Sequence, residues 1–128
     1  MGAGETWYAK PDAGALIVSP AEEAPSDPVD AFADDMTLAE GMARYQAAVT
    51  PEVTRPISTW AGLRTFTPDR CLALGGSEVE GFWWCAGQGG YGFQTAPAAA
   101  RLLADLIAGR ASELDTATVA ALDPGRLR

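Results

Sequence analysis

The clearest helical pattern of apolar and polar positions lies near the C-terminus, over residues 96–108. Its large apolar residues recur at the spacing of one helix face: Leu102, Leu103, Leu106 and Ile107. Two charged residues on the opposite side stand four positions apart and suit an ion pair: Arg101 and Asp105. Thr95 suits the N-cap, Pro97 the first turn and Gly109 a left-handed C-cap. The pattern predicts a half-buried helix.

An apolar run and a glycine-dense turn precede this helix. Residues 82–86 predict a buried strand, in which Cys85 is expected to be a small core residue. The turn carries four glycines: Gly87, Gly89, Gly90 and Gly92. A helix entered through glycines leaves its first N–H groups uncovered and aims the positive end of its dipole at the turn. The turn is therefore a candidate site for an anion or a polarised carbonyl, although a tight connection that binds nothing has the same pattern.

The N-terminal part predicts a β-hairpin. Residues 6–11 and 15–19 are rich in strand-forming side chains and are divided by a short turn at residues 12–14 that contains glycine. Successive strand residues point to opposite faces, so Trp7 and Tyr8 are expected on different sides of the hairpin.

A second helix is predicted to begin at Thr37, where Thr37 and Glu40 have the spacing of a capping box. Four apolar residues keep to one face of it: Leu38, Met42, Tyr45 and Val49. Pro51 is expected to end it. Core packing is the expected role of this face.

Shorter elements fill the rest of the chain. Residues 56–66 predict a strand with a break at Ala61 and Gly62, and residues 71–74 predict another short strand. Residues 111–122 predict a further helix. Arg126 and Arg128, after a turn, are expected to form a frayed and solvated end.

Charge excludes several kinds of partner. Nine Lys and Arg against seventeen Asp and Glu give a net charge of −8, which argues against nucleic acid and anionic membrane surfaces as partners. Residues 20–35 are acidic and broken by prolines. They lack the alternating ligands and pivot glycine of a calcium loop, so a solvated surface loop is expected.

Histidine and cysteine usage excludes further classes of site. The 128 residues contain no histidine, so neither a Cys/His zinc site nor a Ser-His or Cys-His nucleophile can form from this chain. Cys71 and Cys85 are too far apart for a redox CxxC motif. No leader peptide or membrane span is recognisable, so we expect a cytoplasmic protein with reduced thiols.

Arg64 is the principal candidate for binding a ligand. It lies within an otherwise apolar run, where an arginine needs a carboxylate or similar partner if it is buried. An internal ion pair would satisfy that need. A bound ligand would also satisfy it, because the planar guanidinium suits bidentate recognition of a carboxylate.

Several motifs, in order along nearly the whole chain, resemble the FAD-dependent D-amino acid oxidase family, which includes glycine oxidase and the D-amino acid dehydrogenases. The sequence QGGYGFQTAP at residues 88–97 precedes an alanine-rich helix, and WAGLR stands upstream at residues 60–64. The further matches are YAKP at residues 8–11, TPD at residues 67–69 and LDPGR at residues 122–126.

The resemblance implies roles for particular residues. The flavin edge of FAD would lie against the turn and would be contacted by seven residues: Gln88, Gly89, Gly90, Tyr91, Gly92, Phe93 and Gln94. Arg64 would hold the carboxylate of a small amino acid or amine substrate, with Tyr8 closing the pocket and the Gly90 carbonyl accepting from the amine. Hydride transfer to the flavin would then begin an oxidative deamination.

Family members begin with a Rossmann unit that carries GxGxxG, and these 128 residues hold no such unit. We therefore expect a fragment of a two-domain FAD-dependent oxidoreductase that is inactive alone and needs a missing N-terminal nucleotide-binding part. It would be either the C-terminal piece of a truncated or split enzyme or a separate subunit whose companion chain carries the Rossmann domain. The alternatives are a non-catalytic remnant that binds carboxylates, and a remnant that associates with itself as a homo-oligomer.

The elements together predict an α+β fold with a mainly antiparallel sheet and two main helices. By resemblance, residues 6–76 would belong to a substrate domain, and residues 81–128 would return to the FAD domain.

Overall fold

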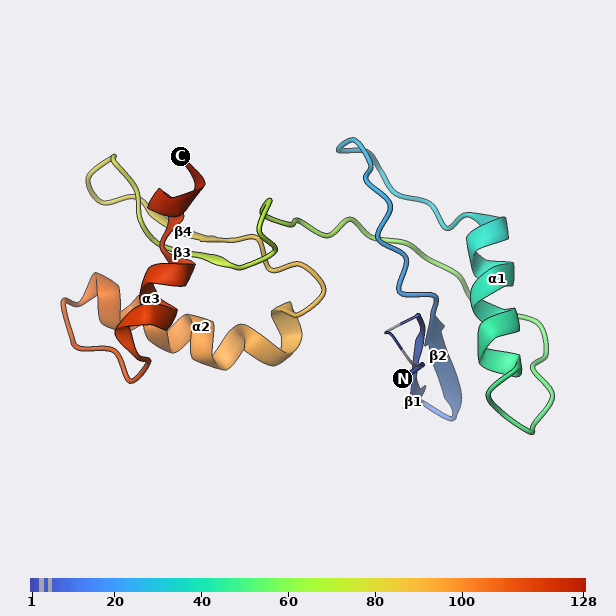
Figure 1. The fold of residues 1–128 in the computed structure, drawn as a ribbon. Coiled ribbons are helices and arrows are strands. Elements are labelled where there is room, and N and C mark those ends of the chain that lie inside the picture. The colour runs from blue at the N-terminus through green and yellow to red at the C-terminus, as the bar shows by residue number, and fades with distance from the viewer. Residues whose placement is uncertain (3, 5) are drawn as a thin grey trace. The chain divides into compact units, whose positions relative to one another are not determined.

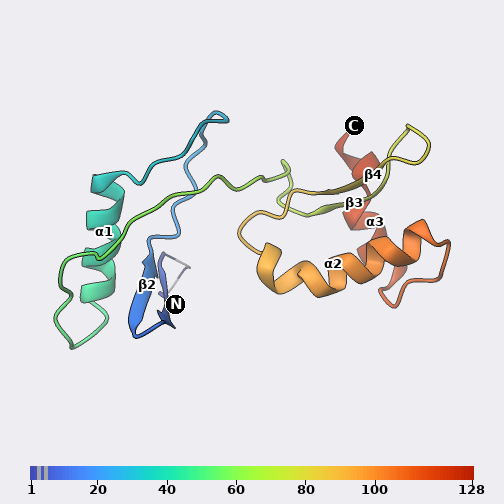
Figure 2. The same cartoon turned by 180° about the vertical axis from the view of Figure 1, so that it is seen from behind.

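The computed structural model describes residues 1–2, 4 and 6–128. They form two compact units, Met1–Leu63 and Arg64–Arg128 (Figures 1 and 2). The fold is α+β, as predicted, and in the described residues the strands form two separate antiparallel pairs. Within the same residues, no helix has both the length and the apolar character needed to cross a lipid bilayer.

The N-terminal unit contains the predicted hairpin. Strand β1 (Tyr8–Asp12) pairs antiparallel with β2 (Ala15–Ser19), with Tyr8 opposite Ser19. Ala13 and Gly14 connect the strands with φ of 45° and 82°. Positive φ at both central residues is the requirement of a type I′ turn, whose twist matches that of the paired strands.

Helix α1 (Asp35–Gln46) begins two residues before the prediction. The carboxylate of Asp34 accepts hydrogen bonds from the Thr37 N–H and hydroxyl, both at 2.8 Å, and is therefore the N-cap. The predicted capping box is wrong, because Thr37 lies inside the first turn of the helix and donates to the N-cap residue Asp34 instead of being the N-cap itself. Glu40 instead pairs with Arg44 one helical turn later, at 2.9 Å.

Helix α1 also ends before Val49 and Pro51, because the side chain of Gln46 bonds to the backbone of the following loop. Its amide oxygen accepts from the Val53 N–H at 2.6 Å, and its amide nitrogen donates to the Pro51 carbonyl at 3.2 Å. The helix packs on the hairpin through an edge-to-face contact of Tyr45 with Trp7, whose ring centroids are 5.2 Å apart.

Two long connections lack helix and strand. Residues 20–34 have no helix or strand and are largely exposed, which agrees with the predicted solvated loop. The predicted strand over residues 56–66 is wrong, because all of these residues are irregular. Ile57 is 90% exposed and Trp60 is 64% exposed. A strand requires a neighbouring strand for its backbone hydrogen bonds, and each strand in the described part of the chain pairs elsewhere, β1 with β2 and β3 with β4.

The C-terminal unit is a strand pair covered by helices. Strand β3 (Ala73–Gly76) pairs antiparallel with β4 (Trp83–Ala86), and helices α2 (Gly92–Ile107) and α3 (Thr116–Leu122) pack against β3. Both views show α2 running alongside the strands (Figures 1 and 2). The short 3₁₀ helix η2 (Pro124–Leu127) ends the chain. The core described here centres on three buried residues: Leu74, Ala99 and Leu102.

Helix α2 extends one turn further toward its N-terminus than predicted. Thr95 is not the N-cap, since its N–H and hydroxyl both donate to the Tyr91 carbonyl, at 3.0 and 2.8 Å. Pro97 consequently lies inside the helix rather than in its first turn. The predicted C-terminus is confirmed, because Gly109 has φ of 64° and its N–H donates to the Leu106 carbonyl in a Schellman motif.

Strand β4 is more exposed than predicted. Trp84 is 44% exposed and Cys85 is also exposed, so the buried strand and the core cysteine were wrong predictions for this chain. The reason is that two strands and the helices on one side leave much of β4 uncovered. The chain exposes 9301 Å², whereas two separate compact globules of half its mass would together expose about 7,800 Å².

We expect Leu102→Ala to destabilise the C-terminal unit by about 2–5 kcal/mol, because the cavity would lie in the centre of a very small core. Urea unfolding followed by NMR resolves the two units. Leu16→Ala is the control, since Leu16 is 53% exposed in the N-terminal unit and its loss should cost about 0.5 kcal/mol or less. Equal effects of the two substitutions would contradict the assignment of Leu102 to the core.

Candidate functional site

The glycine turn, residues 87–92, packs directly against residues 65–67. The Gly89 N–H donates to the Thr65 carbonyl at 2.8 Å. Gly89 has φ of 54°, and a Cβ built on it would lie 2.8 Å from Cε1 of Phe66. Gly87 has φ of 70°, and its Cβ would lie 2.7 Å from Cγ2 of Thr67. Both positions therefore require glycine for backbone conformation and for close approach.

This packing brings Arg64 to the glycine turn. The Arg64 guanidinium lies over the Phe66 ring, with Cζ 5.5 Å from the ring centroid. The edge of the same ring meets Gly89. Phe66 therefore contacts both Arg64, the predicted carboxylate-binding residue, and Gly89 in the predicted flavin-edge turn.

The N-terminus of α2 opens at the end of the glycine turn. The first N–H groups of the helix belong to Gly92, Phe93 and Gln94, and helix geometry gives them no intrahelical partner. Within the described chain, the N-cap residue Tyr91 makes no side-chain hydrogen bond to them. The positive end of the α2 dipole therefore lies beside the glycine turn without a capping side chain.

Other residues predicted for this site are distributed around the turn. Gly90 is exposed, and the side chain of Phe93 is wholly exposed. The Gln88 amide nitrogen lies 3.6 Å from the sulfur of Cys85, so this side chain points back toward β4. Tyr8 lies on β1 in the N-terminal unit and is 44% exposed. The roles assigned to these residues stay predictions.

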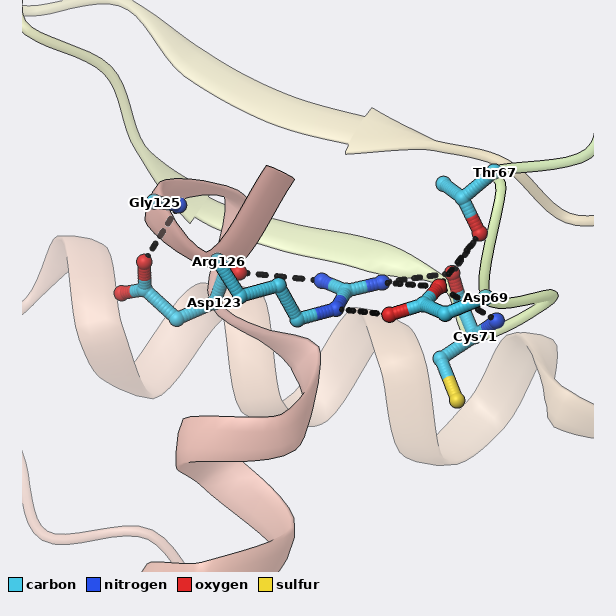
Figure 3. Close-up of polar contacts among 6 residues, drawn as sticks. All are labelled: Thr67, Asp69, Cys71, Asp123, Gly125 and Arg126. Carbon is cyan, nitrogen blue, oxygen red and sulfur yellow. Dashed lines mark hydrogen bonds and ion pairs between the residues drawn. The ribbon is translucent and has the colours of Figure 1, made fainter. Parts of the chain in front are cut away.

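The prediction of a frayed C-terminal end is wrong, because Arg126 is anchored to the turn that precedes β3 (Figure 3). Arg126 Nε donates to Asp69 at 2.7 Å, and Nη2 donates to the other Asp69 oxygen at 3.1 Å. Nη2 also donates to the Cys71 carbonyl at 2.8 Å. Only 16% of the Arg126 side chain is exposed. Arg126 and Asp69 are 57 positions apart, so no local sequence pattern predicts their ion pair.

Asp69 is the centre of this anchor, which we call the Asp69–Arg126 clasp. Besides Arg126, the Cys71 N–H and the Thr67 hydroxyl donate to its carboxylate, at 3.1 and 2.9 Å. These bonds, with that from Arg126 foremost, hold the pKa of Asp69 far below its usual range. Thr67 packs on Gly87, so the clasp connects η2 to the glycine turn through residues 67–71.

A second acidic centre supports the other end of α2. The predicted pair of Arg101 and Asp105 is confirmed at 3.1 Å, but Asp105 is only 3% exposed rather than on the polar side. The Schellman turn returns Arg110 over it, and Arg110 Nε donates to Asp105 at 2.8 Å. This bond and the one from Arg101 lower the pKa of Asp105, so the buried carboxylate stays charged and has a structural role.

Comparison with known families identifies one match. The family model DAO, described as FAD dependent oxidoreductase, matches residues 2–106, which is most of the chain. The match includes the glycine turn, Arg64 and most of α2.

Individual relatives match about half of the chain. A D-amino acid dehydrogenase of Cereibacter sphaeroides is 45% identical over 60 residues, which are 47% of this chain and 14% of the relative. D-amino acid dehydrogenase 2 of Ralstonia nicotianae is 46% identical over 61 residues, 48% of this chain and 14% of the relative. The D-amino acid dehydrogenase of Chromohalobacter salexigens is 39% identical over 56 residues, 44% of this chain and 13% of the relative. The matched stretch thus spans about one seventh of each relative.

We expect Gly89→Ala to destabilise the C-terminal unit more than Gly81→Ala. Both glycines have positive φ, where alanine costs about 1–2 kcal/mol. A Cβ at Gly81 would meet nothing within 4 Å, whereas at Gly89 it would press on Phe66 and add about 1–3 kcal/mol. Urea unfolding measures both variants. Equal losses would contradict the close packing of Phe66 on the glycine turn.

The clasp predicts a specific pH dependence. Because the pKa of Asp69 is lowered on folding from 3.8, its stabilisation is present above about pH 4 and is lost as the pH falls below that value. The difference in unfolding free energy between the wild type and Asp69→Asn should be largest at pH 7 and should shrink toward pH 3. Asp12→Asn controls for the loss of one negative charge. A difference that does not change with pH would contradict the clasp.

Proposed function

Because this chain belongs to the DAO family of FAD-dependent oxidoreductases, we propose that it forms the flavin-edge and carboxylate-binding part of an enzyme that oxidises D-amino acids. The observation that carries the proposal is the packing of Phe66 on Gly89, which sets Arg64 beside the glycine turn at the N-terminus of α2. The names of the matched relatives support D-amino acids as the substrate class.

The glycine turn has the features that a flavin edge requires. Gly87 and Gly89 bring the backbone of the turn directly against Thr67 and Phe66, and the N-terminus of α2, which has no side-chain cap from Tyr91, adds a positive dipole. Main-chain N–H groups in residues 89–94 would stabilise negative charge at the edge of the ring system. When bound, FAD supplies the hydride acceptor for the reaction.

Arg64 supplies the electrostatic contact with substrate in this proposal. Its guanidinium would bind the substrate carboxylate in bidentate fashion and fix the direction in which the Cα–H bond points. The Gly90 carbonyl would accept a hydrogen bond from the amine. Loss of a hydride from Cα and a proton from nitrogen gives an imine, which water converts to a keto acid and ammonia.

The chain needs further protein to work as an enzyme. The matched stretch is about one seventh of each relative, and aromatic surface is exposed at Trp84 on β4 and at Phe82 just before it, whose rings are in edge-to-face contact with centroids 5.0 Å apart. We infer that a Rossmann domain, in the same polypeptide or in a companion chain, covers part of this surface. The division into a substrate part at residues 6–76 and an FAD part at residues 81–128 belongs to the same proposal, as does a cytoplasmic location.

The test combines the chain with the FAD-binding N-terminal part of a related D-amino acid dehydrogenase. Reduction of an artificial electron acceptor should then depend on D-amino acids. Arg64→Gln should lower kcat/KM at least about tenfold, because charge-assisted hydrogen bonds to the substrate carboxylate are lost. Arg55→Gln, which removes another exposed arginine, should leave kcat/KM unchanged.

Two outcomes would contradict the proposal. One is an assembled protein that holds FAD but is not reduced by any D-amino acid. The other is an Arg64→Gln variant with the kcat/KM of the wild type. The chain alone is expected to elute from gel filtration without flavin.

A further inference from the structure

Two arginines fasten the last residues of the chain to the C-terminal unit at separate places. Arg126 binds Asp69, which precedes β3, and Arg128 pairs with Glu78, which follows β3. The two ion pairs differ in strength. Only 16% of the Arg126 side chain is exposed and it donates to both Asp69 oxygens, whereas 54% of the Arg128 side chain is exposed. Exposed ion pairs contribute little, and paired hydrogen bonds from a guanidinium fix geometry.

The groups that Arg126 holds form the surface on which Gly87 packs (Figure 3). The Thr67 hydroxyl donates to the Asp69 carboxylate at 2.9 Å, and Cγ2 of Thr67 would lie 2.7 Å from a Cβ built on Gly87. The Cys71 carbonyl, which accepts from Arg126 Nη2 at 2.8 Å, would lie 3.7 Å from the same Cβ. Arg126 therefore reaches the glycine turn through two different groups.

The turn of residues 67–71 also reaches the glycine turn through Arg70. The Arg70 N–H donates to the Thr67 carbonyl at 3.0 Å and closes the turn. Its guanidinium lies over the Phe66 ring, with Cζ 4.5 Å from the centroid, and the edge of this ring meets Gly89. Gly87 and Gly89 thus both pack on groups whose positions depend on one turn, and the clasp holds that turn.

We propose that Arg126 is a positioning residue for the flavin-edge site: by holding residues 67–71 it sets where the glycine turn and the first N–H groups of α2 lie. This rests on the proposed function and adds the C-terminal end of the chain to the site. Hydrogen-bond donors stabilise a developing charge only where they are held in place in advance. The role therefore predicts that loss of Arg126 loosens the glycine turn more than it destabilises the core.

The first test measures hydrogen exchange by NMR in the whole chain without flavin. The Gly89 N–H, which donates to the Thr65 carbonyl, reports the contact of the glycine turn, and the N–H of Leu102, buried within α2, reports opening of the core. Arg126→Gln should accelerate exchange at Gly89 at least about tenfold more than at Leu102, since charge-assisted hydrogen bonds are lost. Arg128→Gln, which removes the same charge from the same segment, should not separate the two rates.

Further variants test the route through Thr67. Thr67→Ser keeps the hydroxyl that bonds to Asp69 but removes the methyl group that packs on Gly87, so it should also accelerate exchange at Gly89. In its presence Arg126→Gln should have a smaller effect than in the wild type, because the two substitutions act on one chain of contacts. Arg126→Lys should restore part of the protection. Thr67→Ser leaves the clasp intact and so tests the same link even if Arg126→Gln does not fold.

The assembled protein gives a second readout, the reduction potential of its bound FAD. Arg126→Gln should favour the oxidised form by about threefold to tenfold, which lowers the potential by about 14–30 mV for a two-electron couple. The reason is that displaced N–H groups stabilise negative charge less well. Arg128→Gln should leave the potential unchanged. Titration with dithionite measures it without an amino acid substrate.

Equal exchange at Gly89 in Arg126→Gln and Arg128→Gln would overturn the inference. So would additive effects of Arg126→Gln and Thr67→Ser, or a reduction potential that Arg126→Gln does not change. These results leave the proposed function standing, since it is judged by flavin reduction with D-amino acids. Conversely, an assembled protein whose flavin D-amino acids never reduce would overturn the proposed function, while exchange and potential would still decide the role of Arg126.

Discussion

The contact between the glycine turn and residues 65–67 is the constraint on which the candidate site depends. Gly87 and Gly89 have positive φ, and each approaches a side chain so closely that a Cβ would overlap it. The contact sets Phe66 against the turn, and Phe66 in turn holds the guanidinium groups of Arg64 and Arg70. A change in this packing would move the arginines and the N-terminus of α2 relative to each other.

The Asp69–Arg126 clasp also supports the contact between the glycine turn and residues 65–67. It ties the last residues of the chain to the turn that carries Arg70, and Thr67 in the same turn packs on Gly87. Few apolar side chains are buried in this unit, so the clasp provides contacts that a larger hydrophobic core would otherwise provide. Because its core is so small, charge-assisted hydrogen bonds take a larger share in placing η2 than they would in a larger domain.

Local sequence signals predicted the elements well where the deciding interactions are close in sequence. The hairpin, the C-cap at Gly109 and the pair of Arg101 and Asp105 each depend on residues within a few positions of one another. The predictions failed where a neighbouring residue took the N-cap position, or where a predicted strand needed a second strand to pair with. Asp34 displaced Thr37 as N-cap of α1, and none of the strands in the described residues lies beside the segment at residues 56–66 to pair with it.

The sequence alone determined the family, the α+β class and the approximate positions of α2 and the glycine turn, because periodicity and motif spacing record contacts between nearby residues. Only the tertiary structure decided that Phe66 joins Arg64 to Gly89, that Arg70 shares this ring and that Arg126 binds Asp69. The contacts of Phe66 with Gly89 and of Arg126 with Asp69 join residues far apart along the chain. Their geometry follows from how strands and turns pack in space, which a linear pattern of residues does not encode.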